Sequence, residues 1–179
     1  MDLNAERFIP ADVPATWQAL NDPVVLQACI PGCEKFEPAG EHRYEVTLLA
    51  KVGPVSARFK GTMQLSDLQP PTAYALTFEG QGGVAGFAKG RAAVQLKPGS
   101  QDGAAGTLMH YEVSAQVGGK LAQIGSRLID AAARKTADDF FDRFVAQFPS
   151  AAPAAAAPAP ASWWARLAAW FARLFGKAG

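Results

Sequence analysis

The chain has 179 residues, of which 49% are apolar and 18% are charged, and its formal net charge is +1. This length predicts one globular domain with an appendage, and the apolar content predicts an ordinary packed core. Residues 1–148 carry 14 Lys and Arg against 16 Asp and Glu, so this part has no basic excess for holding nucleic acid.

Neither a secretory signal nor a membrane-spanning segment is expected. The opening residues, MDLNAERF, lack the basic and then apolar pattern of a signal peptide, and no run reaches about 20 apolar residues. Cys29 and Cys33 have a C-x3-C spacing that does not match a zinc knuckle, and no second Cys or His pair accompanies them. We therefore expect no metal, two reduced thiols and a cytosolic protein.

The first thirty residues predict a strand and two short helices. Residues 3–9 alternate loosely between apolar and polar, which favours a strand. Asp12 is placed to cap a helix over residues 14–20. Asp22 followed by Pro23 is a second helix start, and that helix is expected over residues 24–30, before Pro31 and Gly32.

The middle of the chain has a period of two, which indicates β-strands. Short breaks rich in Gly and Pro separate the strands, and such short connections favour antiparallel neighbours. The six predicted strands cover residues 34–37, 44–52, 55–65, 73–80, 87–96 and 107–117, with a loop expected at 97–106.

The chain then predicts one long helix over residues 120–148. Gly118 and Gly119 precede it, Pro149 follows it, and apolar residues recur within it every three or four positions. Such a helix would be about 43 Å long, so it needs a broad apolar surface beneath it. The order of the elements predicts an α+β fold in which this helix lies across an antiparallel sheet.

Small residues are frequent on the predicted inner face of the sheet and in the first half of this helix. They predict an apolar internal cavity between the two, of the size that takes lipophilic ligands. The alternative is that small residues only let helix and sheet approach closely. The predicted ligand-binding residues are Tyr44, Leu48, Ala57, Phe59, Gly61, Met63, Leu76, Phe78, Ala88, Gly90, Ala92, Met109, Tyr111, Val113, Leu121, Ile124 and Leu128.

Residues 149–179 predict a linker and an amphipathic helix. Residues 149–161 are uncharged and rich in Ala and Pro, which is typical of an extended linker. If residues 162–179 are helical, aromatic and aliphatic side chains form a stripe along one side of the helix and the cations lie on the opposite side. Such a helix is too short to span a bilayer. We expect it to lie on a membrane surface; a groove on a partner protein and the body of this chain are the alternatives. The predicted membrane-binding residues are Trp163, Trp164, Arg166, Leu167, Trp170, Phe171, Arg173, Leu174 and Phe175.

Few residues indicate catalysis. The loop GQGGVAG at residues 80–86 resembles a phosphate-binding loop, but a strand rather than a helix is predicted after it. A mobile hairpin at a cavity mouth is the preferred interpretation. His42 and His110 have no neighbouring nucleophile and acid that the sequence can identify. We therefore expect no enzyme activity.

Four stretches of the body resemble a known family. They are residues 22–33, which end in IPGC, residues 51–61 (KVGPVSARFKG), residues 80–90 (GQGGVAGFAKG) and residues 117–130 (VGGKLAQIGSRLID). They are similar to the G subunit of carbon monoxide dehydrogenase, a family within the START-like, polyketide-cyclase (SRPBCC) superfamily. The resemblance implies a helix-grip fold, in which a curved antiparallel sheet of about seven strands wraps around a long C-terminal helix and encloses a lipophilic cavity.

The same resemblance implies a function. It implies a non-catalytic accessory protein that binds an isoprenoid quinone without a covalent bond and recruits a molybdenum hydroxylase of the carbon monoxide dehydrogenase type. The implied location is peripheral, on the inner face of the cytoplasmic membrane. Two alternatives stay open: an anchor whose core is filled, which a well-packed interior would favour, and a small-molecule enzyme, which an inward-facing charged pair would favour.

Overall fold

The computed structural model describes residues 1–148, so the predicted linker and amphipathic helix lie outside the described residues. Within that part, no helix is both long enough and apolar enough to cross a membrane. The elements are β1 (Asp2–Ile9), α1 (Val13–Leu20), α2 (Pro23–Cys29), β2 (Cys33–Gly40), β3 (Arg43–Val52), β4 (Val55–Gln69), β5 (Ala73–Gln81), the 3-10 turn η1 (Gly83–Ala85), β6 (Phe87–Gln101), β7 (Ala104–Gly118), α3 (Lys120–Gln123) and α4 (Ser126–Val145).

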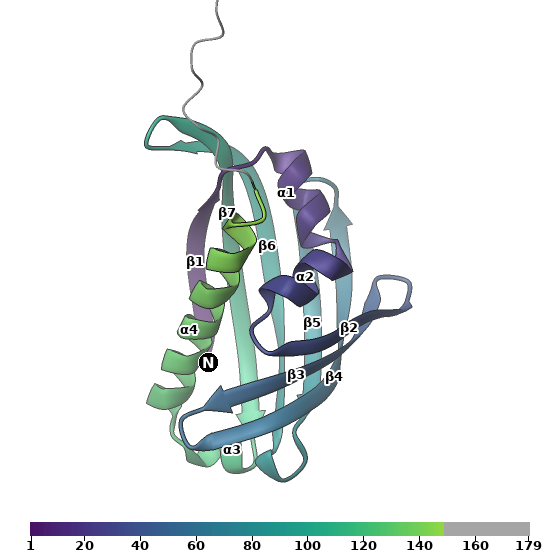
Figure 1. Cartoon of the computed structure of the whole chain (residues 1–179), viewed down its shortest axis with the longest axis vertical. Helices are drawn as coiled ribbons and strands as arrows, with labels where there is room; N and C mark the ends of the chain where they lie inside the picture. The colour runs from purple at the N-terminus through teal and green to yellow at the C-terminus, as the bar shows by residue number, and fades with distance from the viewer. Residues whose placement is uncertain (149–179) are drawn as a thin grey trace, which may run out of the picture.

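The strands form one seven-stranded sheet in the order β1-β7-β6-β5-β4-β3-β2, and every neighbouring pair is antiparallel. The sheet curves around α4, while α1 and α2 cover the upper part of the same face (Figure 1). The predicted α+β, helix-grip architecture is confirmed. Its seven strands are the six predicted in the middle of the chain and the one predicted at its start.

The first two helices begin where their capping residues predict. A carboxylate oxygen of Asp12 accepts a hydrogen bond from the backbone N–H of Ala15 at 2.9 Å. Asp22 accepts from the N–H of Val24 at 2.8 Å, and Pro23 follows it as the first helical residue. These bonds satisfy N–H groups that the first helical turn leaves without a partner.

The helix predicted over residues 120–148 is interrupted, and the prediction of one continuous helix was wrong. It is divided into α3 and α4 at Ile124 and Gly125. Gly125 has φ +97° and ψ 144°, a conformation that suits glycine and breaks the helical hydrogen bonding. The apolar period continues across the break, and for this reason the pattern did not reveal it.

The loop predicted at residues 97–106 is instead an extension of two strands. β6 and β7 stay paired as far as Gln101 and Ala104, and they form a long hairpin that projects at the upper end of the molecule (Figure 1). Asp102 and Gly103 turn the chain with φ values of 52° and 81°, as a two-residue hairpin turn requires. The glycines and the proline of this segment indicate a loop, but the extended pairing of β6 with β7 accommodates them.

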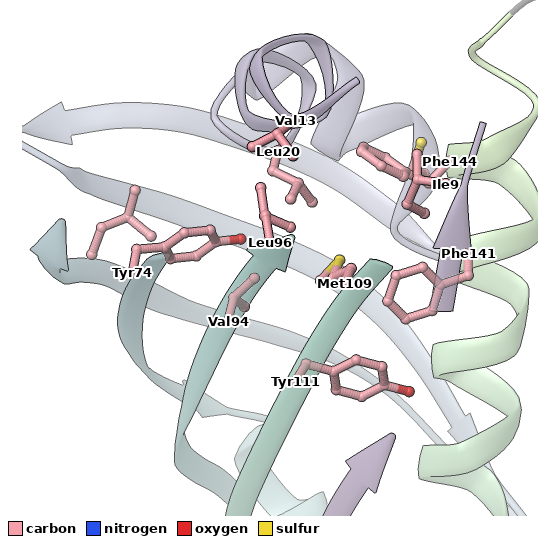
Figure 2. Packing of buried hydrophobic residues seen from close by; sticks show 12 residues of the cluster. Ile9, Val13, Leu20, Tyr74, Val94, Leu96, Met109, Tyr111, Phe141 and Phe144 are labelled. Carbon is pink, nitrogen blue, oxygen red and sulfur yellow. The ribbon is translucent and has the colours of Figure 1, made fainter. Parts of the chain in front are cut away.

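The larger of two apolar clusters fills the upper half of the space between sheet and helices. Figure 2 shows Ile9, Leu20, Tyr74, Met109 and Phe144 converging there from β1, α1, β5, β7 and α4. The ring of Phe144 is fully buried and stacks on Phe140, with centroids 5.6 Å apart. The smaller cluster, around Phe59, Ala85 and Leu121, lies at the lower end. The second half of α4 is therefore held by large aromatic side chains.

Candidate ligand cavity

A cavity of about 520 Å³ lies between the sheet and the first half of α4. This volume falls within the range of small-molecule sites in proteins. Its walls come from all seven strands, from the loop after α2 and from both C-terminal helices. The apolar internal cavity that the sequence predicts is therefore present.

The cavity exists because small side chains face one another across it. On α4 the wall consists of Ala132, Ala133, Thr136 and Ala137, and on the sheet it includes Ala50, Gly80, Ala88 and Ala115. Further along α4, Phe140 and Phe141 are large enough to fill the space and close the upper end. The alternative, in which small residues bring helix and sheet into contact, does not describe this part of the molecule.

The cavity wall offers few hydrogen-bonding groups. The hydroxyl of Thr136 donates to the backbone oxygen of Ala132 at 2.8 Å, so its proton is used within α4. Thr62 and Glu79 also border the cavity. Each lies between two inward-facing residues of its strand, so alternation directs its side chain to the other face of the sheet. A ligand in this cavity would be bound mainly by burial of apolar surface.

Nine of the seventeen predicted ligand-binding residues line the cavity, all on the inward face of the strands or on α3. That they bind a ligand stays a prediction. The nine are Leu48, Phe59, Gly61, Met63, Leu76, Phe78, Ala88, Val113 and Leu121.

The other eight predicted residues lie outside the wall of this cavity, and that they bind a ligand likewise stays a prediction. Tyr44, Met109 and Tyr111 pack in or against the upper cluster, where the aromatic residues of α4 fill the space. The remaining five are Ala57 and Ile124, which pack against the lower cluster, Leu128, which is half exposed, and Gly90 and Ala92, which lie on β6 outside the cavity wall.

Gly90 shows why a small inward-facing residue need not border a cavity. A Cβ atom on Gly90 would lie only 2.7 Å from Cζ of Phe78, so the phenyl ring of Phe78 already covers this position. The ring comes from the neighbouring strand β5, so this glycine makes room for a residue of the sheet rather than for a ligand or for α4.

Sequence reasoning missed the lining residues from the helices and the N-terminus. Ala132, Ala133, Thr136, Ala137 and Phe140 come from α4, and the wall also includes Met1, Leu3, Ile30 and Pro31. The run of small residues on the apolar face of α4 was a usable signal. The loop that carries Ile30 and Pro31 had no periodicity that could indicate its direction.

The glycine-rich loop at residues 82–86 closes the lower end of the molecule. Ala85 is buried in the lower cluster, and a Cβ atom on Gly82 would lie 2.7 Å from the ring of Phe59. The loop leads into β6, as predicted, so no helix begins directly after it as in a phosphate-binding loop. The tip of this loop, Val84, is 84% exposed.

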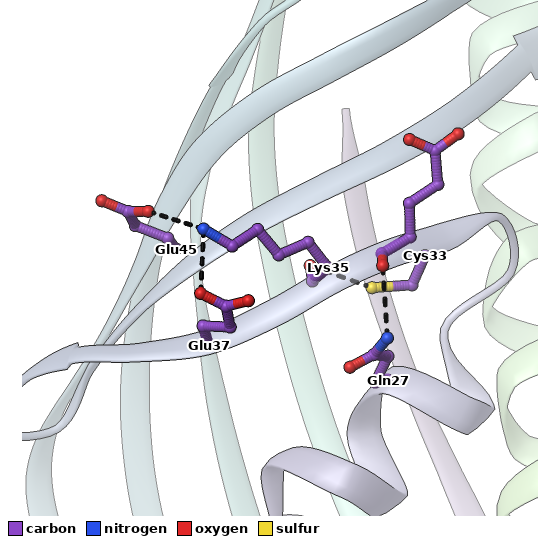
Figure 3. A network of polar contacts seen from close by, with 6 residues as sticks. Gln27, Cys33, Lys35, Glu37 and Glu45 are labelled. Atoms are coloured by element: carbon purple, nitrogen blue, oxygen red, sulfur yellow. Dashed lines mark hydrogen bonds and ion pairs between the residues drawn. The ribbon is translucent and has the colours of Figure 1, made fainter.

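Polar contacts hold α4 and β2 in place beside the cavity. Arg7 of β1 forms an ion pair with Asp138 of α4, and its guanidinium lies 5.7 Å from the ring centroid of Phe141. On β2, Lys35 Nζ lies 2.9 Å from Glu37 and 3.2 Å from Glu45 (Figure 3). These carboxylates raise the pKa of Lys35 above its ordinary value.

The two cysteines are free thiols in this structure. Burial raises the pKa of Cys29, and burial likewise raises the pKa of Cys33, so both favour the neutral thiol. The Cys33 thiol donates to the backbone oxygen of Lys35 at 3.3 Å (Figure 3). Among residues 1–148, no three His, Cys, Asp or Glu side chains group closely enough to hold a metal ion.

The fold and the cavity define the class of this protein as an α+β helix-grip protein with an apolar interior. Solved structures agree at the level of fold. A conserved protein from Geobacillus kaustophilus is 31% identical, with a TM-score of 0.76 over 82% of this chain and 94% of its own. The Zhui aromatase/cyclase from Streptomyces sp. R1128 is 11% identical, with a TM-score of 0.54 over 82% of this chain and 92% of its own. Ara h 8.0201 is 14% identical, with a TM-score of 0.53 over 82% and 96%.

A family model for the G subunit of carbon monoxide dehydrogenase (CoxG) matches residues 7–148. The chain belongs to this family. No curated protein matches the sequence. The match spans the sheet and α4 but not residues 149–179, so it concerns the same part of the chain that contains the cavity.

Proposed function

We propose that this protein is a non-catalytic accessory protein that binds a lipophilic ligand in the cavity between the sheet and α4. The observation that carries the proposal is an apolar space of about 520 Å³, across which small residues of α4 face small residues of the sheet. Packed protein interiors leave few voids larger than a water molecule. A space of this size is therefore best understood as a binding site.

The ligand class that we propose is an isoprenoid quinone of the membrane. A long hydrocarbon tail needs apolar contact and few hydrogen bonds, and the cavity wall has this character. The family description, which names a carbon monoxide dehydrogenase, supports a redox-active ligand. In this proposal the cavity shields the apolar tail from water while the quinone passes between bilayer and enzyme.

The proposed partner is a molybdenum hydroxylase of the carbon monoxide dehydrogenase type, and the proposed location is the inner face of the cytoplasmic membrane. The family description supports the partner. The aromatic and cationic pattern of residues 162–179 supports the location. The linker at residues 149–161 would give the body a reach of about 40 Å from the anchoring segment.

A second candidate is an anchor that carries no ligand. It requires an interior that is filled, whereas a space of about 520 Å³ separates the first half of α4 from the sheet. An enzyme would need an acid and a base facing inward, and the walls formed by residues 1–148 consist almost wholly of apolar side chains. Both features favour the carrier over these alternatives.

The proposal predicts that the protein purified from a quinone-containing bacterium carries quinone, measured by solvent extraction and mass spectrometry. Residues 1–148 are used, because removing the tail excludes carried-over membrane lipid. The double variant Ala88→Leu/Ala132→Leu fills the cavity from both walls and should lose most of the quinone.

Ala93→Leu/Ala131→Leu is the matched control, because these alanines lie on the same strand and helix but are exposed. It should carry as much quinone as the unmodified protein. If solvent extraction of residues 1–148 yields no lipid, even after quinone has been added back, the proposal of a quinone carrier is contradicted. The anchor without a ligand then becomes the working proposal.

A further inference from the structure

Three segments of the body contain no Asp or Glu. They are residues 49–61, 80–91 and 113–129, and together they carry the seven cations Lys51, Arg58, Lys60, Lys89, Arg91, Lys120 and Arg127. The remainder of residues 1–148 carries seven Lys and Arg against 16 Asp and Glu, a net charge of −9. The small overall charge of the chain therefore conceals a strong separation of charge.

The tips of these segments meet at one end of the molecule. The hairpin between β3 and β4, the turn η1 and helix α3 all lie at the lower end in Figure 1. A Cβ atom on Gly53 would lie 3.6 Å from Ile124 and 3.8 Å from Leu128, and one on Gly119 would lie 2.6 Å from Gly86. We call this end the acid-free pole, formed by residues 49–61, 80–91 and 113–129.

Most of the positive charge at the pole is not neutralised within the body. Arg58 is bound by both carboxylate oxygens of Glu34, at 2.7 and 2.9 Å. None of the other six cations forms an ion pair with a carboxylate of residues 1–148. The pole therefore presents a positive potential to any surface that approaches it.

Exposed apolar side chains lie among these cations. Val84 at the tip of η1 is 84% exposed, Leu128 at the start of α4 is 50% exposed, and Phe87 is 36% exposed. They come from separate elements rather than from one continuous patch. Exposed apolar side chains on segments that carry Lys and Arg but no acid have the chemistry of a surface that enters the headgroup region of a bilayer.

The cavity extends into the same end of the molecule. Val52 and Val55 flank the hairpin of the pole, Leu121 belongs to α3, and all three line the cavity. A surface against the pole would thus lie next to the apolar interior. This arrangement favours a lipid bilayer over an acidic protein as the surface that covers the pole, since an apolar ligand could then enter without crossing water.

We propose that the acid-free pole docks directly on a bilayer that contains anionic phospholipid, with its cations on the headgroups and Val84 and Leu128 among the upper acyl carbons. This contact is additional to the one proposed for residues 162–179, and it rests on the proposed membrane location. α4 ends at the upper end of the molecule, about 30 Å from its start at the pole (Figure 1). If residues 149–161 were fully extended they would reach up to about 40 Å, which is long enough for both contacts to share one bilayer.

The test measures binding of residues 1–148 to sedimented vesicles of phosphatidylcholine, with and without phosphatidylglycerol. The Geobacillus protein matches this body over 94% of its own length, so a chain of this extent folds without the tail. We expect binding only to the anionic vesicles, weakening as salt is added. Lys89→Gln/Lys120→Gln should weaken it about 25-fold, or about fivefold for each cation. Val84→Asp should weaken it as well without affecting folding, since the side chain is exposed.

Lys97→Gln/Arg143→Gln is the control with the same change of net charge away from the pole, and it should bind like the unmodified body. The proposal is overturned if the body does not bind anionic vesicles, if neutral vesicles bind it equally, or if both double variants lose the same affinity. It is also overturned if the body binds an acidic protein surface but no vesicle. Vesicle binding by the full-length protein is measured in parallel and includes the contact proposed for residues 162–179. If the acid-free pole does not bind vesicles, the proposal for residues 162–179 is therefore unaffected.

Discussion

At the scale of single residues, the pair formed by Glu34 and Arg58 shows how charge is arranged beside the cavity. Arg58 lies on β4 and Glu34 on β2, so the pair spans β3, which separates these strands in the sheet. Two parallel hydrogen bonds hold the carboxylate in a defined geometry. These bonds lower the pKa of Glu34 below its ordinary value of 4.5.

This pair makes stability depend on pH in a definite direction. A carboxyl group whose pKa is lower in the folded state stabilises the fold above its unfolded pKa, and it loses this effect as the pH falls through its folded pKa. We expect Glu34→Gln to lower the melting temperature at pH 7, and the difference from the unmodified protein to shrink below pH 4.5. Calorimetric unfolding of both proteins between pH 7 and pH 3 measures this difference in melting temperature. Glu112→Gln, at a carboxylate with no cation paired to it in residues 1–148, is the control; an equal response of both variants would refute the assignment.

At the scale of elements, the break between α3 and α4 depends on one glycine. Gly125 has φ +97°, and no atom lies within 4 Å of where its Cβ would be. Any effect of Gly125→Ala therefore comes from the backbone alone, and we expect a loss of about 1–3 kcal/mol in the free energy of unfolding.

Urea denaturation of the Gly125→Ala variant measures this loss. Gly80→Ala is the control, because its Cβ would lie no closer than 3.8 Å to another atom and its φ is not in the left-handed region. If the two substitutions destabilise equally, the conformation at Gly125 is not what separates the helices.

The alternation of apolar and polar residues predicted most of the sheet. In a half-buried strand, successive side chains point to the core and to solvent in turn, so the sequence alternates in the same way. The inward positions of β4, from Val55 to Leu65, agree with the residues that face the cavity and the two clusters. Alternation does not measure how far a strand continues, which explains why β6 and β7 proved longer than predicted.

The sequence predicted a cavity but placed only part of its wall. Which inward residues border empty space depends on the size of the side chains that face them across the core. Tyr111 meets Phe141, with ring centroids 5.2 Å apart, so it is packed, whereas Val113 two residues later borders the cavity. Such pairings join positions far apart in the chain, and periodicity within one element cannot identify them.

At the scale of the whole molecule, the cavity predicts that ligand and stability are coupled. A ligand that binds only the folded state stabilises it by about 2.7 kcal/mol when its free concentration is 100 times its Kd. We expect a short-tailed menaquinone to raise the free energy of unfolding of the ligand-free body by this amount, measured by urea denaturation. Ala88→Leu/Ala132→Leu should show no increase. A similar increase in that variant would place the quinone elsewhere on the protein.

The order of the strands also constrains how the chain reaches its fold. β1, the first strand made, pairs with β7, the last, so that Ile9 lies opposite Thr107, whereas each strand from β2 to β7 pairs with its neighbour in sequence. A nascent chain growing at about 5–20 residues per second must therefore wait roughly 5–20 s before its first strand has a partner. During that interval the hairpins among the earlier strands can form, but the apolar side of β1 stays uncovered. Synthesis of the last strand and of α4 thus sets the moment at which the sheet closes, and contacts of such long range make the final step slow.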